Sequence, residues 1–263
     1  MKIAIIGAGN MGGAVARALA KGKKVNRSDI TVSNPSIGKL EALKADFPDI
    51  HVTTDNREAY IAGQLIILAV KPWKIQGVLE ELKDLFKNSN RMMASMAAGV
   101  STMQIGEWMA LPQETLPPIF RIIPNTAIEV GQSMTFISSA HSTTEKDEEV
   151  LNIFGECGVS MMVDEAMIAS GTALASCGIA YAMRYLRAAM EGGVELGFYP
   201  NDAQKIVMQT MKGAVELLQA KGSHPETEID RVTTPGGITI KGLNAMEEAG
   251  FTASVIEGLR ASK

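Results

Sequence analysis

Residues 2–12 read KIAIIGAGNMG, and this stretch decides the fold of the first half of the chain. The apolar run from Ile3 to Ile6 predicts a buried strand. Gly7, Gly9 and Gly12 follow it with the spacing G-x-G-x-x-G, and a helical pattern from Gly12 to Lys21 comes next. In that setting the first glycine permits a tight turn, the second admits a pyrophosphate, and the third lets helix and strand pack closely. The stretch predicts a dinucleotide-binding turn, and a glycine-rich turn without a ligand is the weaker alternative.

Short apolar runs and amphipathic stretches continue to alternate over the first 140 residues. Further strands are predicted at 30–33, 65–70, 92–95 and 119–123, with a candidate edge strand at 134–137. Helical patterns lie between them, for example at 36–46 and 74–86. Strands that alternate with helices predict a parallel sheet covered on both faces, which is an α/β, doubly wound, Rossmann-type domain.

After about residue 160 the pattern becomes helical, at 165–196, 201–220, 238–249 and 252–262. We therefore predict two domains, a dinucleotide-binding domain over residues 1–160 and an all-helical domain over residues 161–263. Residues 166–183 form a run of 18 without a charge, at the lower limit of a membrane span. Because Ala, Ser, Thr and Gly dominate that run, we expect a helix buried against other helices in an oligomer interface, with no membrane.

Composition excludes several other classes. The formal net charge of −4 argues against a nucleic-acid partner, which would call for a basic excess. Cys157 and Cys177 are too few for a disulfide framework, so we expect a reducing, cytoplasmic location. The three scattered histidines give no ligand spacing, so no metal is expected.

The end of the second predicted strand bears on cofactor choice. An NAD enzyme usually places an acidic side chain there to bind the ribose hydroxyls, but this chain has Ser33-Asn34-Pro35-Ser36, and its first acid is Glu41. Hydroxyls and amides can donate hydrogen bonds to a 2′-phosphate, which an acid would repel. We therefore expect NADPH as the hydride donor, with NADH as a second candidate. An ordinary Asn-Pro turn that starts the next helix is compatible with this interpretation.

Three further strand ends carry small or hydrogen-bonding residues, at Val70-Lys71-Pro72, Ala97-Ala98-Gly99 and Pro124-Asn125-Thr126. Ligands of open α/β sheets lie beyond the carboxyl ends of the strands, and these residues suit a flat nicotinamide ring. Lys71 follows a predicted buried strand directly, which favours a cofactor contact over a solvated surface lysine.

A second candidate site is Thr233-Thr234-Pro235-Gly236-Gly237-Ile238-Thr239, where a polar stretch opens a helix. Free N–H groups and the helix dipole at such an N-terminus favour an anion. A helix cap with a flexible approach explains the same residues equally well.

Together these motifs resemble the pyrroline-5-carboxylate reductase family nearly from end to end. The resemblance rests on the glycine turn, residues 69–72, 97–100 and 121–126, and His224-Pro225. Its most specific part is Asp230-Arg231-Val232-Thr233-Thr234-Pro235-Gly236-Gly237-Ile238-Thr239, which is similar to the family's D-x-V-x-S-P-G-G-x-T.

The resemblance implies NADPH-dependent reduction of 1-pyrroline-5-carboxylate to L-proline by a homodimer, often in a ring of dimers, and it implies a role for each site residue. The pyrophosphate would meet Gly7, Ala8, Gly9, Asn10 and Met11. The adenosine ribose and its 2′-phosphate would meet Ser33, Asn34, Ser36 and Asn56. The nicotinamide half would meet Val70, Lys71, Ala98 and Asn125. The substrate would meet Glu165, Thr234, Gly236, Gly237, Ile238 and Thr239, with the Thr239 hydroxyl as the catalytic group facing the ring nitrogen.

The chain departs from the family pattern in one helix. Residues 175–181 read ASCGIAY where the family has S-G-S-G-P-A-Y, and Ala169 stands in place of an expected aspartate. Two alternatives therefore stay open, a reductase of another small cyclic imine or keto acid and a non-catalytic protein that senses NADP(H).

Overall fold

The computed structural model describes residues 1–86 and 90–263. Two compact units make up the chain, Met1–Ser176 and Cys177–Lys263. The first unit extends past the boundary near residue 160 that the sequence predicts, because the segment beyond it packs on the sheet. Ile168 lies in one buried cluster with Ile123 and Phe136, and Gly171 approaches the Phe136 ring so closely that a Cβ would lie 2.7 Å from it.

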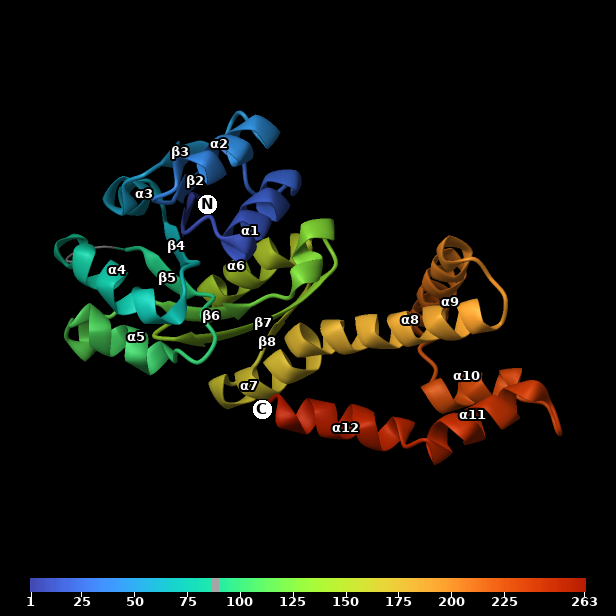
Figure 1. Cartoon of the computed structure of the whole chain (residues 1–263). Helices are drawn as coiled ribbons and strands as arrows, with labels where there is room; N and C mark the ends of the chain where they lie inside the picture. Colours follow the sequence, from blue (N-terminus) through green and yellow to red (C-terminus); the bar gives the residue numbers. More distant parts are fainter. Residues whose placement is uncertain (87–89) are drawn as a thin grey trace. The chain divides into compact units, whose positions relative to one another are not determined.

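The first unit is built on an eight-stranded sheet in the order β3-β2-β1-β4-β5-β6-β7-β8 (Figure 1). The strands are β1 Ile3–Ile6, β2 Ile30–Ser33, β3 His51–Thr53, β4 Leu65–Leu68, β5 Met92–Ser95, β6 Ile119–Ile123, β7 Ser133–Ala140 and β8 Gly158–Met162. β1 to β6 pair in parallel, β7 is antiparallel to β6, and β8 is parallel to β7. The doubly wound sheet predicted from the sequence is confirmed. The candidate edge strand at 134–137 is part of β7, but it is not at the edge, because β8 lies outside it.

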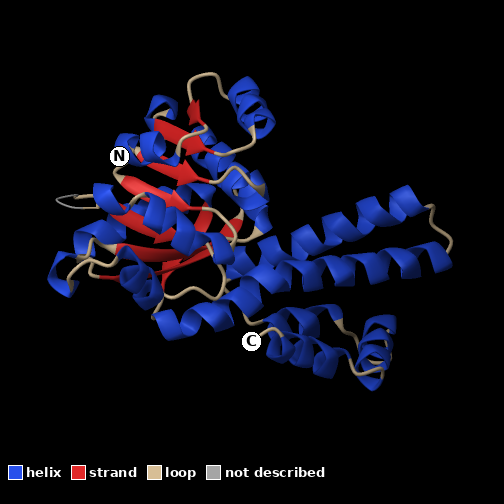
Figure 2. Cartoon of the chain, turned by 60° about the vertical axis from the view of Figure 1, so that its left-hand side comes forward, coloured by secondary structure: helices blue, strands red, loops and turns tan. Residues whose placement is uncertain are grey.

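Helices cover both faces of this sheet, as Figure 2 shows. They are α1 Asn10–Lys21, α2 Ile37–Asp46, α3 Asn56–Ala62, α4 Ile75–Glu81, α5 Thr102–Met109, α6 Thr144–Phe154 and the short α7 Ile168–Gly171. Successive strand residues face opposite ways, so Ile3 and Ile5 join one core with Leu19 of α1, while Ala4 and Ile6 join another core with α3, α4 and α5. Burial on both faces explains why these strands are continuous apolar runs.

The second unit is helical throughout its described residues, with α8 Gly178–Glu195, α9 Pro200–Lys221, α10 Pro225–Val232, α11 Ile238–Glu248 and α12 Phe251–Ala261. The single helix predicted over 165–196 is interrupted. A 3-10 turn at Glu165–Met167, α7 and a π-helical segment at Thr172–Cys177 precede α8. Within this unit the Tyr181 hydroxyl bonds the Gly258 carbonyl at 3.1 Å and Tyr185 packs against Phe251, which ties α8 to α12.

The stretch Glu165–Glu195 is long and apolar enough to cross a membrane by length and composition alone, although only 17% of its most apolar window is buried. One such helix is weak evidence, because helices of soluble proteins pass the same test. An incompletely buried apolar helix is equally what a subunit interface requires.

Candidate functional site

The glycine turn lies between β1 and α1, where Gly7 and Gly12 are required sterically and Gly9 leaves open space beside the helix. Gly7 has a φ of +110°, and a Cβ there would lie 2.7 Å from the Ala69 carbonyl oxygen. At Gly12 a Cβ would lie 1.9 Å from the Gly7 carbonyl oxygen, so helix and turn could not pack. Gly9 faces open space and precedes the first turn of α1, with no side-chain cap hydrogen bond. A cavity of about 570 Å³ borders Gly9 and Asn10, so the turn can accept a pyrophosphate.

The corner after β2 is a network of buried polar groups. Asn34 Oδ1 accepts the Ala8 N–H at 3.0 Å, and Asn34 Nδ2 donates to the Ser36 carbonyl at 3.1 Å. Ser33 is fully buried, and its hydroxyl donates to Asn56 Oδ1 at 2.8 Å. The sequence predicted these side chains as ribose and 2′-phosphate contacts, and the structure brings them together. It also shows that the side chains of Ser33 and Asn34 form hydrogen bonds that stabilise the corner itself.

Sequence reasoning missed one acidic side chain at this corner. Asn56 Nδ2 donates to Glu81 Oε2 at 2.9 Å, and Glu81 is the last residue of α4. No local pattern could have identified Glu81, because it lies 25 residues from Asn56 along the chain.

The residues predicted for the nicotinamide half follow the ends of β4, β5 and β6. β4 ends at Leu68, so Val70 lies in the loop after it rather than in the predicted strand 65–70, and Lys71 follows the strand at a distance of three residues rather than directly. Lys71 and Ala98 are exposed. Asn125 is buried, and its backbone N–H donates to Ser133 Oγ. Its side-chain Oδ1 accepts the Ala127 N–H, and its Nδ2 donates to the Ala175 carbonyl. Asn125 thus joins the end of β6 to the π-helical segment.

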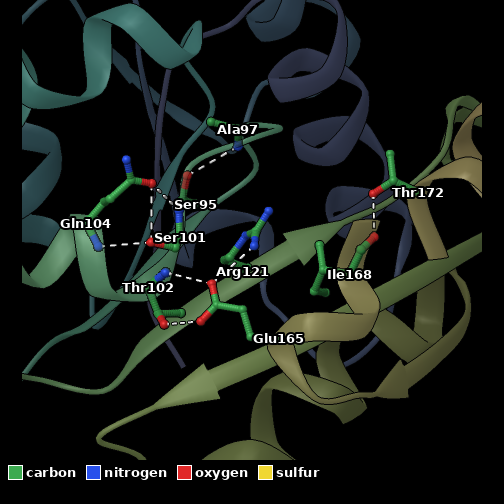
Figure 3. Close-up of polar contacts among 9 residues, drawn as sticks. All are labelled: Ser95, Ala97, Ser101, Thr102, Gln104, Arg121, Glu165, Ile168 and Thr172. Atoms are coloured by element: carbon green, nitrogen blue, oxygen red, sulfur yellow. Dashed lines mark hydrogen bonds and ion pairs between the residues drawn. The ribbon is translucent and has the colours of Figure 1, made fainter. Parts of the chain in front are cut away.

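Glu165 lies among side chains of the first unit (Figure 3). Its carboxylate accepts the Thr102 N–H at 2.8 Å, contacts the Thr102 hydroxyl, and pairs with Arg121 Nη1 at 3.1 Å. Burial raises the pKa of this carboxyl, but the bonds from Thr102 and Arg121 outweigh burial and hold the pKa below its ordinary value. The carboxylate therefore joins the N-terminus of α5 to β6, and its predicted substrate contact stays a prediction.

The glycine loop of the second unit opens α11. Gly236 has a φ of +73°, and the Gly237 N–H donates to the Thr234 carbonyl at 2.8 Å. Gly237 itself has a φ of −66°, so its need for glycine is steric: a Cβ would lie 2.5 Å from Thr234 Oγ1. Ile238 is 88% exposed and Thr239 is exposed, with no hydrogen bond from the Thr239 hydroxyl within the described residues. No side chain caps α11 by a hydrogen bond within the described residues, so the structure does not support the helix-cap interpretation, and the anion site stays a prediction.

The segment that leads into this loop is held by a buried carboxylate that the sequence analysis did not identify. Glu228 of α10 is 9% exposed and accepts from Ser223 Oγ at 2.7 Å, Lys221 Nζ at 3.0 Å and Arg231 Nη1 at 2.5 Å. These hydrogen bonds, that from Ser223 first, lower the pKa of Glu228 to about 2. Glu228 therefore connects the end of α9 to α10, which leads into the loop.

Metal-binding chemistry has no support in residues 1–86 and 90–263, where no group of three or more His, Cys, Asp and Glu side chains could hold an ion. Cys157 is buried, and burial raises the pKa of its thiol to about 11, so it is a poor nucleophile.

Comparison with known proteins covers both units. Residues 165–263 match the family model for pyrroline-5-carboxylate reductase dimerisation, and residues 2–99 match the NADP oxidoreductase, coenzyme F420-dependent model. Pyrroline-5-carboxylate reductase 2 of Dictyostelium discoideum is 36% identical over 98% of this chain and 89% of its own length. Pyrroline-5-carboxylate reductase 1 of the same organism is 37% identical over 98% of this chain, which spans 48% of that longer protein.

A solved structure agrees in fold over both units. The pyrroline-5-carboxylate reductase of Coxiella burnetii is 29% identical and superposes with a TM-score of 0.89, covering 99% of this chain and 95% of that one. Because pyrroline-5-carboxylate reductase 2 of Dictyostelium discoideum exceeds 30% identity over almost the whole length of both chains, the chain belongs to the pyrroline-5-carboxylate reductase family.

Proposed function

We propose that this protein reduces 1-pyrroline-5-carboxylate to L-proline with NADPH, as a homodimer in the cytoplasm. The observation that carries the proposal is the glycine turn, where Gly9 leaves the first turn of α1 open to a pyrophosphate beside a cavity. The substrate is that of the relatives, which are pyrroline-5-carboxylate reductases.

The chain's own residues would bind and orient the reactants. When bound, NADPH supplies a hydride to the imine carbon of the substrate. A cyclic imine can bind with its nitrogen already protonated, so no strong general acid is required. The N–H groups at the start of α11 would hold the substrate carboxylate, and the Thr239 hydroxyl would orient the ring nitrogen. Proximity and orientation then account for much of the rate.

The dimer is supported by the apolar surface of the second unit. Among its exposed large side chains are Met183, Phe198, Tyr199, Met208, Val215, Ile238 and Phe251. Large apolar side chains that a single chain leaves exposed are suited to burial in an interface. A ring of dimers is the larger assembly implied by the resemblance. The cytoplasmic location is supported by two cysteines that are both free.

NADPH oxidation followed with and without 1-pyrroline-5-carboxylate tests the function, with proline identified by mass spectrometry. A six-membered cyclic imine carboxylate and a small 2-keto acid form the comparison set. Faster turnover of either would identify a different reductase. Tight NADPH binding without turnover of any substrate would identify a sensor.

A further inference from the structure

The corner after β2 contains a continuous relay of hydrogen bonds that ends on a carboxylate. The Ser33 hydroxyl bonds Asn56 at 2.8 Å, and Asn56 bonds Glu81 at 2.9 Å. The relay therefore runs from the end of β2, through the first residue of α3, to the last residue of α4.

The chemistry of the three groups fixes the direction of both bonds. An ionised carboxylate only accepts hydrogen bonds, so the NH₂ group of Asn56 must face Glu81. Its carbonyl oxygen then faces Ser33, whose hydroxyl must donate to it. The Ser33 hydroxyl hydrogen is thus engaged by Asn56, and one of the two amide hydrogens of Asn56 is engaged by Glu81, so neither is free for a phosphate at this corner.

Neighbouring charges reinforce the negative character of the corner. Arg57 is the nearby cation, but its guanidinium pairs with both carboxylate oxygens of Asp84, at 2.7 and 2.6 Å. Arg57 Nη1 also bonds the Glu81 carbonyl at 2.9 Å, which fixes the end of α4. Asp55 and Glu58 add two further carboxylates on the Asn56 side. Arg57 is therefore largely neutralised.

Dinucleotide-binding sheets commonly hold the adenosine ribose with an acid at the end of the second strand. The sequence has none there, and the fold supplies one from α4. We propose that Glu81 is the residue that sets the choice between NADH and NADPH. Its carboxylate accepts hydrogen bonds from the ribose hydroxyls of NADH and repels the 2′-phosphate of NADPH. The Asn56 amide can donate to that phosphate only when its hydrogen bond to Glu81 is broken. The site accepts both cofactors, with a weaker preference for NADPH than Ser33-Asn34-Pro35-Ser36 alone predicts.

The inference rests on the proposed function only for the placement of the cofactor, so the test measures binding to the full chain without substrate. Glu81→Gln removes the charge but keeps an acceptor for Asn56. We expect the ratio of the NADH to the NADPH dissociation constant to rise about tenfold, the scale of one repulsive charge contact at a partly exposed site. Adenosine 2′,5′-bisphosphate should bind more tightly and ADP should not.

The matched control is Glu80→Gln. It removes the same charge from the neighbouring residue, whose carboxylate accepts from Gln76 at 3.2 Å instead of from Asn56. We expect the ratio of dissociation constants to stay constant. Glu81→Ala removes the charge as well and should reproduce the shift, so it replaces the glutamine variant if that variant does not fold.

Two outcomes would overturn the proposal. One is an equal shift in Glu80→Gln, which would assign the effect to net charge. The other is a parallel loss of affinity for both cofactors together with a lower melting temperature, which would leave Glu81 a structural residue. Binding of both cofactors without turnover of 1-pyrroline-5-carboxylate would instead refute the proposed function and leave this inference standing.

Discussion

The Thr239 hydroxyl, exposed at the start of α11, is the side chain on which the proposed chemistry depends most directly. Thr239→Val keeps the shape and removes the hydroxyl that would accept a hydrogen bond from the protonated ring nitrogen. Losing a hydrogen bond to a charged group costs about 1.5–3 kcal/mol, so kcat/KM for the imine should fall about 10- to 150-fold. Binding of NADPH alone should stay constant, as measured by titration.

Thr233→Val is the matched control for this variant. The Thr233 hydroxyl bonds the carbonyls of Ile229 and Asp230 at the end of α10, so its loss should lower the melting temperature and leave kcat/KM unchanged. The opposite result for Thr239→Val, lowered stability with unchanged kinetics, would contradict the active-site role and leave Thr239 a structural residue.

At the scale of elements, Glu165 connects the first turn of α5 to β6. Glu165→Gln should cost about 1–3 kcal/mol of unfolding free energy, because the Thr102 N–H and the mostly buried Arg121 guanidinium lose a charged partner. Denaturant unfolding at neutral pH measures this loss. Unchanged stability with a raised KM for the imine would instead support the substrate contact implied by the family resemblance.

Glu228 links α9 to α10, and its bonds predict a dependence on pH. Its pKa is about 2 in the folded chain against an ordinary 4.5, so its contribution to stability is complete above 4.5 and is lost as pH falls towards 2. The melting temperature of Glu228→Gln should therefore lie below that of the wild type at pH 6, and the gap should narrow below pH 4.5. A constant gap would contradict this assignment.

The exposed ion pair Lys212–Glu216 on α9 provides the control for that measurement. Exposed pairs contribute little to stability, so Glu216→Gln should leave the melting temperature nearly unchanged at every pH.

At the scale of the whole molecule, the exposed apolar surface of the second unit predicts association. Met208 on α9 is 53% exposed, and Met208→Glu replaces this exposed apolar side chain by a charged one. We expect sedimentation to show a dimer for the wild type and monomers or aggregates for this variant. Gln209→Glu adds the same charge at the next exposed position and should remain dimeric if Met208 lies in the interface. A wild-type monomer at micromolar concentration would contradict the homodimer.

Sequence alone determined the elements whose signals are local. The central strands are apolar runs because both faces of the sheet are buried, and the glycine turn is recognisable because three glycines with a fixed spacing fall within six residues. β3 and β8 escaped prediction since edge strands are short and only partly buried, and His51–Thr53 carries no apolar pattern. The interruption at Thr172–Cys177 escaped as well, because an apolar helical pattern continues through it.

Only the tertiary structure decided how distant polar side chains are paired. Asn56 and Glu81 are 25 residues apart, and Thr102 and Glu165 are 63 apart. The sequence predicted Ser33 and Asn34 as phosphate donors, whereas in the fold the Ser33 hydroxyl donates to Asn56, whose amide donates in turn to an acid on α4. The physical reason is that burial and periodicity act on neighbouring residues of one element, while hydrogen bonds and charges depend on which elements the completed sheet brings together.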